Sequence, residues 1–286
     1  MESIKRTASI SPWQGVSAKE WHDWKWQYRN RVCTIHQLAA VLEKPPAALK
    51  KYGTVAMVYP FVVTPYYLSL MNMEDENDPL RRQSFPDERE INFSLGGVAD
   101  PLEEERDMPV SGLVHRYRDR CLTIVTNMCA IYCRHCNRKR AWRKDRNGEN
   151  TGHLERMVDY VAKTKHIREV IVSGGDPLTL KDSILDWFLG SLRSIPHVDV
   201  LRIGSRMPVV MPMKITRKLC NMLRKHRPVW FNTQFNHPNE ITPEATHACE
   251  MILEAGIPIS NQSVLLRGIN DNYETLRDLF YGLQRI

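Results

Sequence analysis

Residues 122–136 read Leu-Thr-Ile-Val-Thr-Asn-Met-Cys-Ala-Ile-Tyr-Cys-Arg-His-Cys, an apolar run that leads directly into three cysteines. The run at 122–125 has the length and β-branched content of a buried strand. Cys129, Cys133 and Cys136 then follow with C-x3-C-x2-C spacing, on the loop after that strand. In folds built from parallel strands, active sites lie at the carboxyl ends of the strands, so we expect the function at this loop.

The alternation of apolar runs with helical patterns continues downstream. Four more runs suit buried strands, at residues 169–172, 198–203, 229–231 and 257–266. One separating helix is predicted after Thr242, a typical N-cap that is followed by Pro243 at the first helical position, with Gly256 as its stop. Five strands that alternate with helices predict βαβ units and a parallel sheet or barrel.

Upstream of residue 115 the pattern changes. Short helices are predicted around Trp21, Trp24 and Trp26 and over residues 38–49, and polar segments with proline follow. We interpret the tryptophans as helical core rather than as an aromatic platform for a ligand. The chain therefore divides into an N-terminal helical extension, residues 1–115, and a βα part, residues 116–286.

The composition is that of a globular protein: of 286 residues, 42% are hydrophobic and 26% are charged. Lys and Arg exceed Asp and Glu by 40 − 33 = 7, and this excess is spread along the chain, which favours small anionic ligands over nucleic acid. The seven cysteines are an odd number, and we find neither a signal peptide nor an apolar run of roughly 20 residues. These features predict a cytoplasmic protein that does not span a membrane.

Three thiolates on one loop suit an iron–sulfur cluster. A cubane 4Fe–4S cluster usually takes four cysteines, so three would leave one iron open to an external ligand. A structural zinc site is the first alternative, but zinc requires four protein ligands, and His135 is accompanied by no second cysteine knuckle. Three cysteines that meet by chance in a buried element are the second alternative.

The cysteine spacing resembles that of the radical S-adenosylmethionine (SAM) superfamily, and the flanking segments resemble the lysine 2,3-aminomutase family within it. The segments that match in order and spacing are HRYRDR at 115–120, CRHCNRKR at 133–140, SGGDPL at 173–178, RIGSR at 202–206, NTQFNHPNEIT at 232–242 and NQSVLLRG at 261–268. The resemblance implies an α/β fold: a partial (β/α)6 radical SAM barrel, with five of its six strands present, and an N-terminal, mostly helical extension.

The resemblance implies three cofactors: a 4Fe–4S cluster, SAM and pyridoxal 5′-phosphate (PLP). In this family a 5′-deoxyadenosyl radical starts the migration of an amino group from C2 to C3, which converts an α-amino acid to a β-amino acid. L-Lysine is the expected substrate, and glutamate and arginine are alternatives. The expected partners are the amino acid, an electron donor such as flavodoxin or ferredoxin, and further copies of the chain in a homo-oligomer, but neither nucleic acid nor a membrane.

The resemblance also implies roles for single residues. Cys129, Cys133 and Cys136 would ligate the cluster. Residues that would bind SAM follow the second, third and fifth predicted strands: Ser173, Gly174, Gly175, Asp176, Ser205 and Gln262. A tight β–α turn alone would also explain the two glycines, and a structural amide would explain Gln262.

Arg116, Tyr117 and Arg120 match the PLP-contacting motif of the family, and paired guanidinium groups suit a phosphate. Arg138 matches the arginine that holds the substrate carboxylate, which a bidentate pair would orient. A solvated basic face and simple charge support for the cluster are the alternatives. We interpret His135 and His237 as structural, and Gln234 stands where the lysine enzymes typically have histidine.

The family's PLP-anchoring lysine and its two substrate-gripping acidic residues lie beyond the last matching motif, and no Gly-Gly-Gly-Lys run occurs here. We therefore expect a C-terminally truncated chain that is incomplete for catalysis. Two other functions stay open: a β-lysine-forming enzyme that modifies a translation factor, and a noncatalytic iron–sulfur or zinc-binding fragment.

Overall fold

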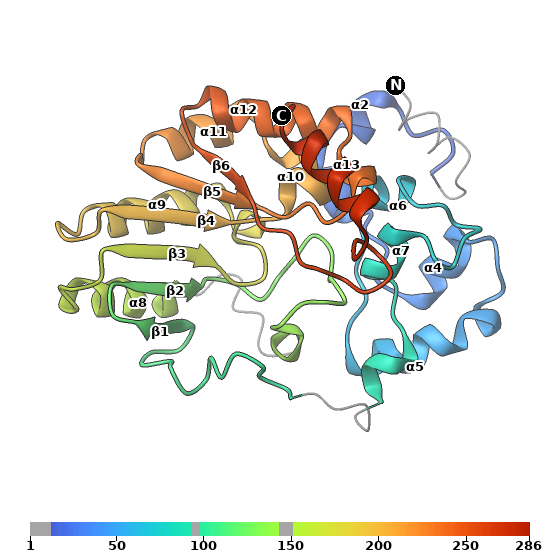
Figure 1. Ribbon diagram of the computed structural model, residues 1–286, viewed down its shortest axis with the longest axis horizontal. Helices are drawn as coiled ribbons and strands as arrows, with labels where there is room; N and C mark the ends of the chain where they lie inside the picture. The colour runs from blue at the N-terminus through green and yellow to red at the C-terminus, as the bar shows by residue number, and fades with distance from the viewer. Residues whose placement is uncertain (1–12, 93–97, 143–150) are drawn as a thin grey trace.

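The protein is described here by a computed structural model that covers residues 13–92, 98–142 and 151–286. Its centre is a six-stranded sheet with the order β1-β2-β3-β4-β5-β6. The strands are β1 Leu113–Tyr117, β2 Arg120–Ile124, β3 Glu169–Ser173, β4 Val200–Gly204, β5 Val229–Thr233 and β6 Ile259–Asn261. β1 is antiparallel to β2, whereas β2 to β6 are parallel to one another. The predicted α/β fold is confirmed, with the strand order of a partial barrel (Figure 1).

The parallel strands are the five apolar runs predicted from the sequence, but β6 is shorter than the predicted run at 257–266. It pairs with β5 only over Ile259–Asn261, because the chain then leaves the sheet. β1 was not predicted. The polar residues His115 and Arg116 follow Val114, so it lacks an apolar run, and pairing with β2 through a turn at 118–119 makes it a strand.

Helices cover one face of the sheet (Figure 1). They are α8 Gly152–Lys163, α9 Asp182–Arg193, α11 Arg217–Arg224 and α12 Pro243–Glu254. Alternate strand residues such as Val170, Val172 and Leu201 are fully buried, whereas Ile171 and Arg202 between them are only partly buried. Because neighbouring residues of a strand point to opposite faces, the sheet has a covered face and a more open face.

The predicted boundaries of α12 are confirmed. The Thr242 hydroxyl accepts a hydrogen bond from the Ala245 amide, and Pro243 occupies the first turn. Gly256 follows the helix with a φ of +71°, a conformation that glycine adopts without strain.

The N-terminal extension packs at the carboxyl end of the parallel strands (Figure 1). Its helices are α2 Ala18–Trp21, α3 Trp24–Arg29, α4 Ile35–Val41, α5 Lys50–Val58, α6 Pro65–Ser69 and α7 Pro79–Ser84. Trp21 and Tyr66 of the extension belong to the same hydrophobic core as Phe188 and Phe231 of the βα part. Side chains also cross between the two parts, since the Thr64 hydroxyl donates to the Val210 carbonyl at 2.7 Å. The two parts therefore share one core.

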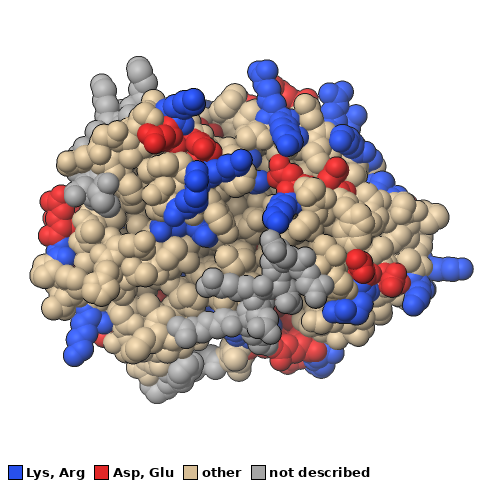
Figure 2. Space-filling view, turned by 180° about the vertical axis from the view of Figure 1, so that it is seen from behind, with Lys and Arg blue, Asp and Glu red and all other residues tan. Residues whose placement is uncertain are grey.

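Two further helices complete the fold, α10 Met207–Val210 after β4 and α13 Tyr273–Leu283 near the end of the chain. Within the described ranges, no helix combines the length and the apolar character that crossing a bilayer requires. On the face seen in Figure 2, Lys and Arg side chains occur in several groups intermixed with Asp and Glu, in line with the spread expected from the sequence.

Candidate functional site

The cysteine loop, residues 126–138, leaves the carboxyl end of β2 and runs against the N-terminal extension. Three hydrogen bonds fix its backbone. The Tyr132 amide donates to the Val62 carbonyl at 2.9 Å, and the Arg134 amide donates to the Gln83 carbonyl at 2.8 Å. The Arg31 guanidinium donates to the Cys129 carbonyl at 2.7 Å. The extension therefore sets the path of the segment that carries the cysteines.

The Ser173-Gly174-Gly175-Asp176 turn supports the same loop from the sheet side. The Gly175 amide donates to the Thr126 carbonyl at 2.5 Å, and the Asp176 amide donates to the Met128 carbonyl at 2.7 Å. Gly174 has a φ of +132°, and a Cβ atom on it would lie 2.5 Å from the Thr126 oxygen. A Cβ atom on Gly175 would collide with the Met128 carbonyl. The glycines are thus required where the turn meets the cysteine loop, which accounts for the tight turn expected from the sequence and leaves their contact with SAM a prediction.

We expect Gly175→Ala to lower the free energy of unfolding by about 1–3 kcal/mol, because the new methyl group must push the Met128 backbone away. The same shift should reduce the iron bound per chain after anaerobic reconstitution. Denaturant unfolding and iron analysis measure the two effects.

Gly53→Ala is the matched control for this substitution. Gly53 lies in α5, where a Cβ atom would meet only Ile35 Cγ1 at 3.9 Å. Alanine is favoured over glycine inside a helix, so stability should stay level or rise. Equal losses in the two variants would contradict the tight contact between the turn and the cysteine loop.

Two thiols of the loop, those of Cys129 and Cys136, are poorly suited to carry charge by themselves. Burial raises the pKa of Cys136 to about 11, and the neighbouring Cys133 raises it further. Burial also raises the pKa of Cys129 well above its ordinary value, and the charges of Asp176, Cys136 and Cys133 add to this effect. Metal binding deprotonates such thiols and supplies the missing positive charge, so the three residues fit a metal cluster chemically. Within the described residues, no three His, Cys, Asp or Glu side chains are arranged around a single-ion site.

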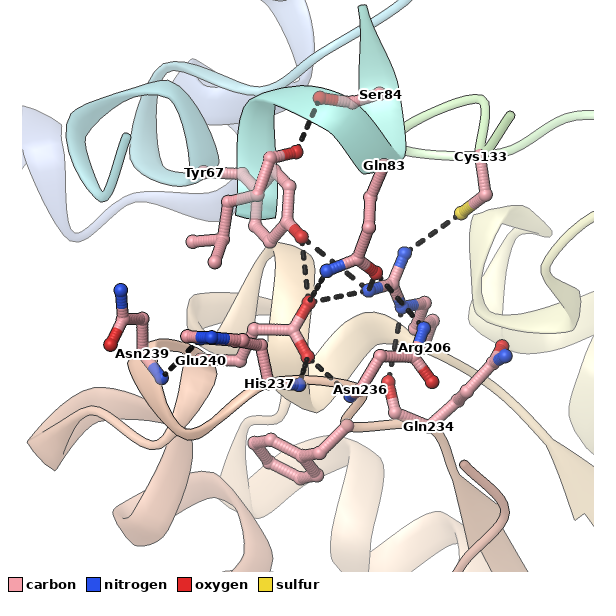
Figure 3. Close-up of polar contacts among 12 residues, drawn as sticks. Tyr67, Gln83, Ser84, Cys133, Arg206, Gln234, Asn236, His237, Asn239 and Glu240 are labelled. Carbon is pink, nitrogen blue, oxygen red and sulfur yellow. Dashed lines mark hydrogen bonds and ion pairs between the residues drawn. The ribbon is translucent and has the colours of Figure 1, made fainter. Parts of the chain in front are cut away.

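Two nitrogen donors point at the cysteine sulfurs. The Arg138 amide lies 3.4 Å from Cys136 Sγ. Nη1 of the Arg206 guanidinium donates to Cys133 Sγ at 2.9 Å (Figure 3). Hydrogen bonds of this kind to the sulfurs are one of the features that set the potential of iron–sulfur clusters.

Arg206 belongs to a buried polar network that joins the two parts of the protein (Figure 3). Its Nη2 donates to Glu240 Oε1 at 2.6 Å and to Gln83 Oε1 at 2.8 Å, and its Nε donates to the Gln234 carbonyl at 3.0 Å. Burial alone would lower the pKa of Arg206, but the charges of Cys133 and Glu240 raise it overall. The guanidinium is therefore protonated and held in one orientation beside Cys133.

Glu240 is the acceptor at the centre of this network and is 0% exposed. Besides Arg206, it accepts hydrogen bonds from the Tyr67 hydroxyl at 2.6 Å, from Gln83 Nε2 at 3.3 Å and from the Asn236 amide at 2.5 Å. Tyr67 and Gln83 come from the extension, whereas the other members come from loops after β4 and β5. A buried carboxylate with this many donors is fully satisfied.

Asp176 and Ser205 are brought together, although the sequence predicted only that each contacts SAM. The Ser205 hydroxyl donates to Asp176 Oδ1 at 2.8 Å, and the Arg206 amide donates to Asp176 Oδ2 at 2.9 Å. Burial raises the pKa of Asp176 to about 6, although these hydrogen bonds oppose the rise. The pair joins the loops that follow β3 and β4, and the Asp176 amide contacts the cysteine loop at Met128.

A cavity of about 340 Å³ opens beside the carboxyl end of β2, and its lining includes Thr126, Asn127, His153, Glu104 and Arg138. Arg138 donates from Nε and Nη2 to Glu104 Oε1, at 2.9 and 2.6 Å. Nη1 of Arg138 makes no hydrogen bond with the residues that the structure describes. The guanidinium of Arg138 is therefore held by Glu104 at the edge of the cavity, and its Nη1 can donate to a ligand.

Comparison with known proteins places this arrangement in a family. Residues 123–280 match the radical SAM superfamily. The chain is 40% identical over 288 residues to the glutamate 2,3-aminomutase of Clostridioides difficile, an alignment that covers 100% of this chain and 67% of that protein. It is 44% identical over 271 residues to the L-lysine 2,3-aminomutase of Clostridium subterminale. This alignment covers 95% of this chain and 65% of that protein. The chain belongs to the radical SAM aminomutase family.

A third relative, the L-lysine 2,3-aminomutase of Bacillus subtilis, is 41% identical over 277 residues, or 97% of this chain and 59% of that protein. The chain thus spans between 59 and 67% of the length of these relatives. The family predicted from the sequence is confirmed.

The residues that family resemblance assigns to PLP lie away from the cysteine loop. Tyr117 and Arg120 are opposite each other in the β1–β2 pair, and Arg120 is the first residue of β2. The length of β2 therefore separates them from the cysteine loop, roughly 13 Å at ~3.3 Å per residue. Arg116 donates from Nε to Asp107 Oδ2 at 2.7 Å. Tyr117 is 61% exposed, so its ring is accessible to a ligand.

The remaining candidates take varied positions. Gln262 is exposed at the end of β6, where its amide donates to the Thr233 carbonyl at 2.9 Å. His237 caps a short helical turn by accepting from the Asn239 amide, a structural role. Burial lowers the pKa of His135 to about 3, with Arg206 adding to the effect, so this ring is neutral. Its Nε2 lies 3.4 Å from Gln234 Nε2.

Sequence reasoning missed Arg206 and Glu240. Both lie inside segments that match the family, RIGSR and NTQFNHPNEIT, but neither received a role. The available signal was charge placement. Arg206 immediately precedes the uncharged run Met207-Pro-Val-Val-Met-Pro-Met213, which suits a buried segment. Because a buried charge needs a partner of opposite charge, this placement predicts an acidic residue beside Arg206.

Proposed function

We propose that this protein is a radical SAM, PLP-dependent 2,3-aminomutase that converts L-lysine to a β-amino acid. The observation that carries the proposal is the cysteine loop at the carboxyl end of β2, because its three thiols would leave the fourth iron of a cubane open to an external ligand. The choice of lysine is supported by the 44% identity to a lysine enzyme over 95% of this chain.

Cys129, Cys133 and Cys136 would hold the cluster, and Arg116, Tyr117 and Arg120 would hold PLP. When bound, the 4Fe–4S cluster supplies an electron to the sulfonium of SAM, and PLP supplies a carbonyl that holds the amino group of the substrate. The chain's own residues supply position. The glycine turn and Arg31 fix the cysteine loop from two sides, so its thiols need little reorganisation when they bind metal.

For SAM we propose the site bordered by Ser173, Gly174, Gly175 and Asp176, with Ser205 and Gln262 further along the sheet. Ser173 ends β3 on the open face, where a Cβ atom on Gly204 would come within 3.5 Å of its hydroxyl. The absence of a side chain at Gly204 keeps this hydroxyl accessible. Ser205 acts on the site through Asp176, because its hydroxyl is directed to that carboxylate.

Arg138 is the residue we propose to bind the substrate carboxylate. Glu104 fixes its Nε and Nη2, and Nη1 remains to contact a carboxylate in the adjoining cavity. Fixing the guanidinium in advance lowers the entropy cost of orienting the substrate.

We expect Arg138→Lys to raise the KM for the amino acid about tenfold, since a lysine ammonium cannot bind Glu104 and a second carboxylate in one plane. Steady-state kinetics with mass-spectrometric detection of product measures this change. Arg140→Lys is the matched control, because Arg140 borders the same cavity and lies 3.3 Å from Glu104. A KM that rises equally in both variants would contradict a specific role for Arg138.

We further propose a low-potential electron donor such as flavodoxin or ferredoxin, a homo-oligomer and a cytoplasmic location. The last of these is supported by the odd number of cysteines, which argues against a disulfide framework and so favours a reducing compartment.

The test is anaerobic incubation of the full-length protein with SAM, PLP and reductant, against lysine, glutamate and arginine separately. Mass spectrometry should find a β-amino acid isomer of lysine and 5′-deoxyadenosine. Turnover of glutamate or arginine in place of lysine would change the substrate and keep the chemistry. Reconstitution that yields only bound zinc would refute the proposal and favour a noncatalytic zinc module.

A further inference from the structure

We propose that Arg206 sets the reduction potential of the cluster, because its guanidinium donates a charged hydrogen bond to Cys133 Sγ at 2.9 Å. This inference rests on the proposed function, in that it requires a cluster on Cys129, Cys133 and Cys136. It assigns Arg206 the part of a positioning residue that acts through a ligand sulfur rather than through the substrate.

The geometry leaves Arg206 little freedom. The residue is 8% exposed, and its guanidinium also donates to Glu240, Gln83 and the Gln234 carbonyl at 2.6, 2.8 and 3.0 Å. These acceptors lie around the side of the fork that does not face Cys133 (Figure 3). Nη1 is therefore aimed at the sulfur by the rest of the network and needs no cluster to hold it there.

The sign of the effect follows from charge. Reduction adds one negative charge to the cluster, and a cation next to a ligand sulfur stabilises the reduced form more than the oxidised form. This interaction is strong at a buried site, where water screens it weakly. Arg206 should therefore raise the potential, and so make the cluster easier to reduce.

Glu240 limits this effect from the other side. Its carboxylate lies 2.6 Å from Arg206 Nη2 and is completely buried. The pair is neutral as a whole but has its positive end toward the cysteine loop. Removing either partner should shift the potential, in opposite directions, and this opposition separates electrostatic tuning from mere structural support.

The competing explanation is a structural ion pair that joins the extension to the barrel. Such a pair would affect stability when broken, but it would leave the potential of an intact cluster unchanged. Tyr67→Phe provides the matched control, since the Tyr67 hydroxyl binds Glu240 at 2.6 Å in the same network and does not touch a cysteine.

The experiment is a redox titration of reconstituted full-length protein with dithionite, followed by electron paramagnetic resonance. Arg206→Gln should make reduction about tenfold less favourable, a fall of ~59 mV for one electron. Arg206→Lys keeps the charge and should fall by less. Glu240→Gln should shift the potential upward. Tyr67→Phe should lose stability and keep the wild-type potential.

The outcomes separate the inference from the proposed function. Absence of a cluster in the wild-type protein would remove both. An intact cluster with unchanged potential in Arg206→Lys and Arg206→Gln would overturn the inference alone. If Arg206→Gln fails to fold, the inference is tested by the downward shift of the potential in Arg206→Lys and the upward shift in Glu240→Gln. Equal shifts of one sign in all variants would overturn the inference.

Discussion

Alanine at Cys129, Cys133 or Cys136 is expected to abolish the iron–sulfur charge-transfer absorption of the reconstituted protein and, with it, any cleavage of SAM. The reason is coordination number. A cubane with three protein ligands has one open iron, and losing a further thiolate leaves a second iron without a protein ligand. Anaerobic reconstitution, the visible spectrum and iron and sulfide analysis measure the result.

Cys33→Ala is the control for these substitutions. Cys33 is an exposed thiol on the surface of the extension, so its loss should leave iron content and spectrum at wild-type values. A cluster that survives replacement of Cys133, or a cluster lost equally in Cys33→Ala, would show that the C-x3-C-x2-C loop is not its ligand set.

The second large effect concerns Glu240. We expect Glu240→Ala to lower the free energy of unfolding by about 3–5 kcal/mol, because it leaves the buried charge of Arg206 without its partner. The Tyr67 hydroxyl and the Asn236 amide lose an acceptor in the same step, which adds to the loss. Urea unfolding followed by circular dichroism, on the apoprotein, measures this change without any contribution from the cluster.

Asp199→Ala provides the comparison. Arg168 Nε and Asp199 Oδ2 lie 2.8 Å apart, as close as many buried pairs, but both side chains are more than half exposed. Water screens such a pair, so its removal should cost less than about 1 kcal/mol. Similar losses in the two variants would mean that the buried network contributes no more than a surface contact.

Much of the fold follows from local sequence. The five parallel strands and α12 are encoded by short apolar runs and by a capping threonine with its proline, and each of these signals acts within a few residues. β1 is different, because residues Leu113–Tyr117 become a strand only by pairing with β2. His115 and Arg116 are polar, so the strand lacks the apolar run that indicates the other strands.

The candidate site was predictable where it is local, and not where it depends on distant contacts. The cysteine spacing lies within eight residues, so the sequence indicates the loop directly. The Arg206 network joins positions up to 173 residues apart, such as Tyr67 and Glu240, and no local pattern encodes that pairing. Arg138 was expected to bind a substrate carboxylate, which stays a prediction, and in this structure its guanidinium pairs with Glu104, 34 residues earlier.

The glycine turn shows how one motif supports two readings. Sequence reasoning assigned Gly174 and Gly175 to a ligand, because glycine allows a close approach. The structure shows the tight turn, with the backbone of Thr126 and Met128 against the two glycines, and contact with SAM stays a prediction. A requirement for glycine therefore identifies a point of close approach, and the sequence alone does not say that a neighbouring loop is one of the groups that approach it.

The anchoring of the cysteine loop limits how segments of this protein can be exchanged with those of relatives. Arg31, Val62 and Gln83 hold its backbone, yet all three precede residues 123–280, the segment that carries the superfamily signature. That segment is therefore not a transferable cassette. Grafted into another scaffold, it would bring the cysteines without the contacts that fix their path. Recombination between related aminomutases should succeed only when the cysteine loop and the residues that contact it, Arg31, Val62 and Gln83, come from the same parent.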